Sequence, residues 1–125
     1  MGEPVRIQRV REYVDRPDAS DGTVVLLVDR IWPRGLAKEK VDVPWHRDVA
    51  PSTGLRKWFG HEPERFAEFR RRYREELDAN PATESLVDAA GDAPVLLLYD
   101  AKDTEHNQAV VLADWLRDRR AAQHR

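Results

Sequence analysis

Two groups of polar and basic side chains could carry the chemistry of this chain. One group follows the apolar run 23–28, and the other follows the apolar run 95–99. Arginine and lysine attract phosphates and carboxylates, whereas a histidine can exchange a proton near neutral pH. The members are Asp29, Arg30, Arg34 and Lys38 after the first run, and Asp100, Lys102, His106 and Asn107 after the second.

The two apolar runs are typical of buried β-strands. Both are rich in valine and leucine and lack the polar alternation of a half-exposed strand, so we expect helices to cover both faces of the sheet. The sequence therefore predicts a single α/β domain with a small, mainly parallel three-layer sheet flanked by helices. If the two strands are parallel neighbours, their carboxyl ends meet at one edge, where such sheets bind ligands.

Periodicity and turn residues predict the other elements. Residues 5–10 alternate like a half-exposed strand, and the segment 29–51 is interrupted by Pro and Gly, which favours a long irregular excursion. Further helices are expected from the cap Ser52 to Gly60, from Pro63 through Leu77, over 82–90, and after a cap at Asp103 or Thr104. We place the core of the domain at about residues 5–116 and expect the charged tail, 117–125, to fray.

The composition indicates a folded domain with a strongly charged surface. The 125 residues include 41% hydrophobic and 35% charged side chains, and the formal net charge is only −2. A near-neutral chain is a poor nonspecific binder of nucleic acid, because such binding depends on neutralising phosphates. Without cysteine the chain has no disulfide and no thiolate nucleophile. No apolar run approaches the length that crosses a bilayer, and we expect a cytoplasmic protein that does not contact membranes.

Cofactor and metal motifs give little support to a more specific chemistry. The sequence has no G-x-G-x-x-G motif, P-loop, H-E-x-x-H motif or nucleophile elbow, and we expect no cofactor. A metal site built from His61, His106 and either Asp29 or Asp100 is conceivable. Nearby arginine and lysine side chains would oppose a divalent cation, so we predict no metal.

Four separated segments of the chain resemble the bacterial YeaO-like family, also called domain of unknown function 488. They are VDRIWPRG at 28–35, APS at 50–52, LRKWFGH at 55–61 and LYDAKD at 98–103, with His106 and Asn107 beyond. The resemblance covers about residues 5–116 and implies a compact α/β fold, but no particular reaction. Two positions depart from the family pattern: Gly54, where relatives often carry an acid, and Asp100, where relatives usually carry a small residue.

The matching positions enlarge the candidate site. The candidate catalytic residues are His106, His61 and Asp29, and the candidate ligand-binding residues are Arg30, Arg34, Lys38, Ser52, Arg56, Lys102 and Asn107. In this interpretation basic side chains hold an anion and a histidine moves a proton, while the amide and the carboxylate orient them. The extra carboxylate of Asp100 weighs against a site that only binds anions.

Several candidates also have a purely structural interpretation. Arg30 and Arg34 could pair with Asp29, or could clamp carbonyl groups of the irregular segment. Ser52 is expected to cap the helix that follows it, and His61 could cap the end of the same helix. These alternatives stay open at the level of sequence.

The function that the sequence favours is binding of a small anion in a basic, histidine-containing pocket, with or without acid–base chemistry. A phosphorylated metabolite or a nucleotide would suit such a pocket. A nucleic-acid-binding module is the second choice, and would use Arg30, Arg34, Lys38, Arg56 and the arginines of 70–74. A protein-interaction module without catalysis is the third. The sequence fixes neither the oligomeric state nor the order of the strands.

Overall fold

The strands form one parallel sheet with β3 at its centre. The computed structural model describes residues 4–17, 19 and 22–123. Within them the strands are β1 (Val5–Arg9), β2 (Val24–Leu27) and β3 (Val95–Tyr99), in the order β1-β3-β2. Val95 faces both Val5 and Val24, so the three strands start in register. The predicted α/β class and parallel sheet are confirmed, and all five residues of β3 are buried.

The strands are connected by α-helices and short 3₁₀ turns. The α-helices are α1 (Val10–Asp15), α2 (Thr53–Phe59), α3 (Phe66–Ala79), α4 (Pro81–Ala90) and α5 (Gln108–Gln123). Short 3₁₀ turns occur at η1 (Lys38–Lys40), η2 (Arg47–Val49) and η3 (Pro63–Arg65). Across the described residues no helix is both long and apolar enough to cross a membrane.

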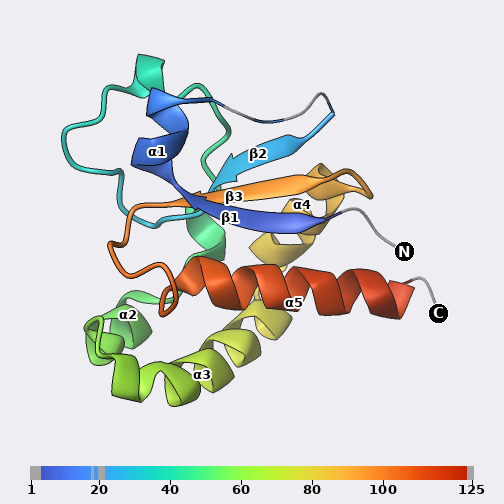
Figure 1. The fold of residues 1–125 in the computed structure, drawn as a ribbon. Helices are drawn as coiled ribbons and strands as arrows, with labels where there is room; N and C mark the ends of the chain where they lie inside the picture. The colour runs from blue at the N-terminus through green and yellow to red at the C-terminus, as the bar shows by residue number, and fades with distance from the viewer. Residues whose placement is uncertain (1–3, 18, 20–21, 124–125) are drawn as a thin grey trace.

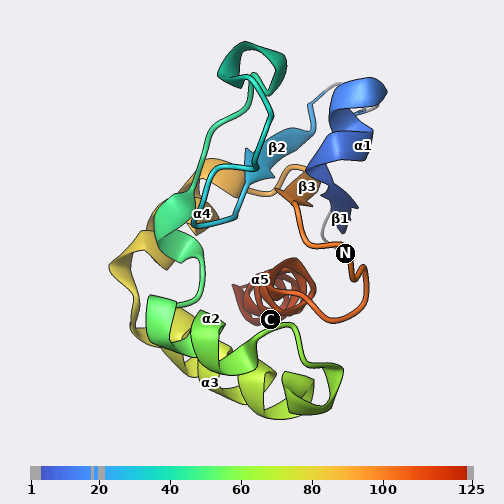
Figure 2. The ribbon, with the colours of Figure 1, turned by 90° about the vertical axis from the view of Figure 1, so that its left-hand side faces the viewer.

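The sheet is covered on both faces (Figures 1 and 2). On one face α5 lies between the sheet and α3, which explains why its buried residues run almost without interruption from Val111 to Leu116. On the other face α1 and the long irregular segment after β2 form the second layer. This smaller core contains Val10, Leu27, Val41, Leu96 and Leu98. The apolar strand residues are therefore divided between two cores, as the doubly covered sheet requires.

The helix α1 replaces the end of the expected first strand and the start of the expected loop. The spacing of Val10, Tyr13 and Val14 is helical, and all three side chains pack on the smaller core. The helix is only six residues long. A segment this short owes its helical state to packing rather than to intrinsic propensity, which explains why turn and strand signals were misleading here.

The start of α5 also differs from the expectation. Asp103 accepts hydrogen bonds from the backbone N–H groups of Glu105 and His106, at 2.9 and 3.0 Å, and forms a tight turn. The helix begins later, where the Oδ1 atom of Asn107 accepts the N–H of Val110 at 3.1 Å. Asn107 is therefore the cap, and His106 precedes the helix instead of lying in its first turn.

The end of α5 corrects the expectation of a tail that frays from residue 117. The helix continues to Gln123. Arg120 is buried, and its Nη2 atom donates to the carbonyl groups of Gly91 and Ala93 at 3.0 and 2.7 Å. Arg117 donates in the same way to the carbonyl of Val5. The charged side chains are thus bonded to the body of the domain, which holds the helix in place.

We predict that replacing Asn107 with alanine lowers the free energy of unfolding by about 1–2 kcal/mol, because the helix loses its cap and a buried amide loses its bonds. Urea unfolding would measure the change. The matched control is Thr104→Ala, at the exposed position that the sequence offered as an alternative cap; its cost should stay below about 0.5 kcal/mol. Equal costs for the two variants would contradict the assignment of the cap.

Candidate functional site

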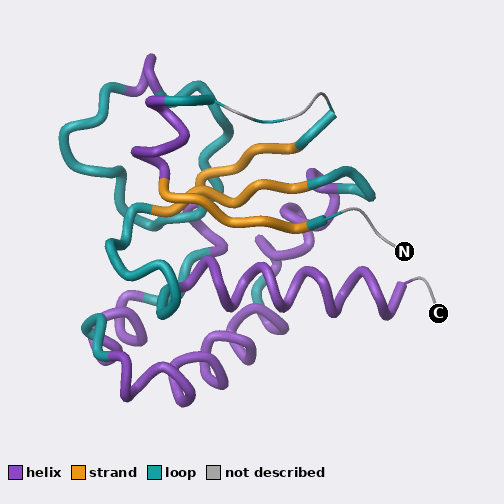
Figure 3. The backbone as a smooth tube through the Cα atoms, viewed as in Figure 1, coloured by secondary structure: helices purple, strands orange, loops and turns teal. Residues whose placement is uncertain are grey.

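A cavity of about 720 Å³ opens where β2 and β3 end. The arrowheads of the strands point to the same end of the molecule, and the loops that leave β2 and β3 lie there (Figures 1 and 3). The segments 29–34 and 100–103 line the cavity from the two strand ends, and Asn107 and Gln108 line it from the start of α5. Residues of α2 and its flanks complete the wall. The parallel arrangement therefore brings the two predicted groups together, except for Lys38 and His106.

Asp29 connects the two strand ends to α5. One oxygen of its carboxylate accepts the backbone N–H of Asp100 at 2.9 Å, and the other accepts the side-chain amide of Gln108. The carbonyl group of Asp29 accepts the indole N–H of Trp45 at 2.6 Å. Burial raises the pKa of the Asp29 carboxyl to about 6, and the nearby charge of Asp100 acts in the same direction. This carboxyl is thus poised to change charge just below neutral pH.

The neighbouring carboxylate of Asp100 is neutralised by α1. Arg11 binds Asp100 through its Nε atom at 2.7 Å, and its Nη2 atom donates to the carbonyl of Arg34 at 2.8 Å. One guanidinium thus joins the segments that follow β2 and β3. The sequence suggested that Asp100 would oppose an anion, but the partner that compensates its charge lies on a helix that the sequence did not predict.

Arg30 is held in place by backbone carbonyl groups. Its Nε atom donates to the carbonyl of Pro51 at 3.2 Å, and its Nη2 atom donates to that of Ala50 at 3.5 Å. This is the carbonyl clamp that the sequence left open as an alternative. The bonds fix the segment before α2 against the end of β2, while Arg30 still lines the cavity and contributes positive charge.

Three other cations line the cavity without protein partners. Across the described part of the chain, the side chains of Arg34, Arg56 and Lys102 form no hydrogen bond or ion pair, and all three residues are exposed. The acids of the wall differ, because Asp103 is also engaged. Bonds from the backbone N–H of Glu105 and then from His106 hold the pKa of Asp103 below its usual value. The cavity is therefore lined by cations that have no protein partner among the described residues and by acids that are already bonded.

His61 reaches the cavity through an unusual turn at the end of α2. Gly60 ends the helix with a left-handed backbone at φ 54°, and His61 continues in the same region at φ 58°. A residue other than glycine rarely adopts this backbone conformation, which persists where the surrounding structure requires it. The turn places His61 in the cavity wall, where its ring lies 6.2 Å from that of Phe59.

Two candidate residues, Lys38 and Ser52, do not line the cavity. The ammonium of Lys38 lies 5.7 Å from the ring centre of Trp32. Ser52 caps α2 by accepting the N–H of Leu55 at 3.2 Å, and its hydroxyl donates to Glu76 at 2.6 Å. Both therefore have structural contacts of their own.

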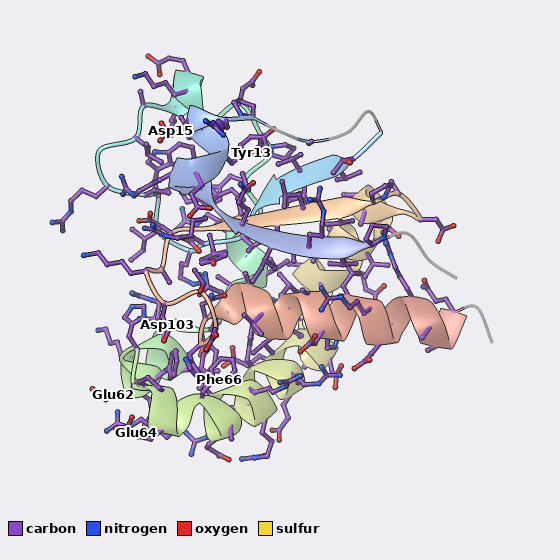
Figure 4. The ribbon with its side chains drawn as sticks, in the orientation of Figure 1. Tyr13, Asp15, Glu62, Glu64, Phe66 and Asp103 are labelled. Atoms are coloured by element: carbon purple, nitrogen blue, oxygen red, sulfur yellow. The ribbon has the colours of Figure 1, made fainter. Side chains whose placement is uncertain are left out.

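His106 does not line the cavity, and its ring contacts Asp103 and Phe66 instead. Its Nδ1 atom lies 2.9 Å from Asp103, and its ring meets that of Phe66 edge-on at 5.2 Å. Figure 4 shows Asp103 on the loop before α5 and Phe66 at the start of α3, at the same end of the molecule. The structure thus assembles Asp29, Arg30, Arg34, Arg56, His61, Lys102 and Asn107 around one cavity, without His106, Lys38 or Ser52.

Two residues that support the site were missed at the level of sequence. Arg11 belongs to the unexpected helix α1, which the helical spacing of its apolar residues could have revealed. Gln108, the donor to Asp29, carried no signal, because nothing in the sequence relates a glutamine to a carboxylate 79 residues away. The side chain of Arg9, in β1, also donates to the carbonyl of Ala101 at 3.1 Å and holds the loop after β3 from the side of β1.

The raised pKa of Asp29 predicts a specific dependence of stability on pH. Because the folded protein holds this proton more tightly than the unfolded chain, the contribution of Asp29 to stability is present at low pH. It is lost as the pH rises through about 6. When the pH is lowered from 7.5 to 5, we expect the free energy of unfolding of the wild-type protein to rise by roughly 1 kcal/mol relative to that of Asp29→Asn. Urea unfolding of both proteins at the two pH values measures this difference. The same pH dependence in both proteins would refute the assignment.

Comparison with known proteins identifies the family. The model of the inactive DUF488-N3 subclade matches residues 4–125. The uncharacterized protein YeaO of Escherichia coli K12 is 44% identical over 115 residues, which cover 90% of this chain and 98% of that protein. The uncharacterized proteins Mb3100c of Mycobacterium bovis and Rv3073c of Mycobacterium tuberculosis H37Rv are each 45% identical over 116 residues, covering 92% of this chain and 95% of each relative. No solved structure gives a significant match. The chain thus belongs to the YeaO-like DUF488 family.

Proposed function

We propose that the protein binds a small anion, such as a phosphorylated metabolite or a nucleotide, in the cavity at the ends of β2 and β3. The observation that carries this proposal is that the cations and the acids of the cavity wall differ in whether they are bonded to other groups of the protein. Arg34, Arg56 and Lys102 have no protein partner within the described residues, whereas the acids of the wall are bonded. An anion would supply the partner that the three cations lack.

The origin of the three cations also favours a bound ligand. Arg34 follows β2, Arg56 belongs to α2 and Lys102 follows β3. Like charges from three separate elements repel one another across the cavity, and a bound anion would relieve this repulsion. Guanidinium groups suit phosphate and carboxylate oxygens because two N–H groups of one plane can bind two oxygens. Carboxylates and phosphate esters are therefore the ligand classes to test first.

A binding role is favoured over a catalysed reaction. His106, one of the two histidines expected to move a proton, lies outside the cavity wall and is bonded to Asp103. The family model that matches the chain is described as an inactive subclade. His61 lines the cavity, but a histidine that shares a site with unpaired cations can serve as a ligand for an anion without moving a proton.

The arginines of α3 give less support to a nucleic-acid-binding module. Arg70 is paired with Asp114 and Arg74 with Asp118, both on α5, while Arg71 and Arg72 share Glu68. A phosphate backbone would have to compete with these pairs for each guanidinium. The cavity, by contrast, offers cations with no competing partner among the described residues.

Two neighbouring residues of α2 allow a matched test. Arg56 lines the cavity and Lys57 does not, although both are exposed and carry one positive charge. We expect Arg56→Gln to weaken the binding of adenosine monophosphate at least about tenfold, which corresponds to the loss of one charge-assisted hydrogen bond. Lys57→Gln should change the affinity less than about twofold. Isothermal titration calorimetry at constant ionic strength measures both affinities.

Two outcomes would contradict the proposal. One is an affinity that falls equally in Arg56→Gln and Lys57→Gln, because this would indicate nonspecific attraction by the surface. The other is the absence of binding to wild-type protein by adenosine monophosphate, inorganic phosphate and simple carboxylates alike. A steep loss of affinity for single-stranded DNA with added salt, in place of binding to small anions, would favour the nucleic-acid-binding module.

A further inference from the structure

The wall of the cavity contains an exposed apolar residue beside its cations. Among the described residues Ile31 is the one large hydrophobic side chain that is exposed, at 58% of its surface. A lone aliphatic residue on an open surface needs no explanation. Ile31 differs because it lies between Arg30 and Trp32 in the segment that lines the cavity. Its exposure therefore leaves apolar surface where a ligand would lie.

The rest of the wall has the same mixed character. Apolar residues from several separate segments line the cavity together with Ile31, namely Trp32, Pro33, Ala50, Pro51, Phe59, Phe69 and Ala101. The volume of about 720 Å³ lies within the range of pockets for organic ligands, which are mainly apolar with a few polar groups that set orientation. Most of these residues are buried, so the apolar surface open to a ligand lies mainly on Ile31, with the partly buried Trp32 and Ala101. A bare phosphate ion would leave this surface in contact with water.

The segment that carries Ile31 is bonded to other elements of the fold. Arg34 is three residues from Ile31, and its carbonyl is fixed by Arg11 at 2.8 Å. Arg30, next to Ile31, is fixed to the carbonyl of Pro51 at 3.2 Å. The backbone is thus anchored on both sides of Ile31 by bonds to other elements, so the fold sets the place of this residue in the cavity wall.

We propose that the ligand is an organic phosphate ester with an apolar body, and that Ile31 recognises that body. The inference rests on the proposed function, because it assumes that the unpaired cations hold the phosphate. It adds that apolar contact distinguishes the true ligand from inorganic phosphate and from esters of polar alcohols. Ile31 is then a specificity-determining residue, while Arg34, Arg56 and Lys102 supply the attraction that all phosphate esters share.

The test compares two phosphate monoesters with the same charged group and different bodies. Phenyl phosphate carries an apolar ring, and glycerol 3-phosphate carries a hydrated polyol. We expect wild-type protein to bind phenyl phosphate about tenfold more tightly than glycerol 3-phosphate, since burial of part of the apolar surface of a phenyl ring contributes about that factor. Ile31→Ala should remove most of the preference by weakening phenyl phosphate alone. Ile31→Leu should keep it, because it retains a branched apolar side chain.

The outcomes separate this inference from the proposed function. If both esters bind equally and Arg56→Gln weakens both, the inference about the body is wrong and the anion site stands. A preference for phenyl phosphate that persists in Ile31→Ala would overturn the role of Ile31. Failure of both esters to bind would contradict the proposed function itself. Because Ile31 is exposed, its variants should unfold within a few degrees of wild type, and thermal unfolding checks that they are folded.

Discussion

The carboxylate of Asp29 is the interaction on which the architecture of the site depends. Asp29 follows the end of β2. Its carboxylate accepts the backbone N–H of Asp100, after β3, and the side-chain amide of Gln108, at the start of α5. Three elements that are distant in the sequence are therefore fixed at one point. Burial raises the pKa of this carboxyl to about 6, although the two hydrogen bonds act in the opposite direction. Together with Arg11, which binds Asp100 and the carbonyl of Arg34, this carboxylate joins the backbone of the loops that carry Arg34 and Lys102.

The second requirement is that acidic groups near the cavity be compensated. Arg11 neutralises Asp100 and also binds the carbonyl of Arg34, so one side chain both removes a negative charge and positions a positive one. Arg30 has the corresponding role on the side of α2, where it clamps two carbonyl groups. Arg11 and Arg30 thus hold segments of the wall together, whereas the side chains of Arg34, Arg56 and Lys102 have no protein partner among the described residues. This division links the packing of the fold to the proposed binding of an organic phosphate.

Much of the fold could be predicted because its signals are local. The apolar runs predicted β2 and β3. Ser52 and Gly60 predicted the two ends of α2, because a cap and a left-handed glycine act on adjacent residues. The strand order depends on distant packing, which no local pattern reports. The helix α1 had a local signal in the spacing of Val10, Tyr13 and Val14, which the neighbouring strand and turn signals obscured. The cap of α5 was misplaced because Asp103 forms a turn just before Asn107. In the site, the convergence of Arg34 and Lys102 followed from the parallel strands alone. The orientation of His106 toward Phe66 did not, because it depends on how a turn at Asp103 precedes the helix.

The central claim is that the exits of two parallel strands form one site for the phosphate of an organic ester. The most direct measurement is a crystal structure of the wild-type protein with phenyl phosphate. The account predicts a phosphate between Arg34, Arg56 and Lys102, with nitrogen–oxygen distances of about 2.7–3.2 Å, and a phenyl ring against Ile31. An ester ordered elsewhere, for example over the paired arginines of α3, would contradict the account. So would a structure in which Arg34 and Lys102 lie at opposite edges of the sheet.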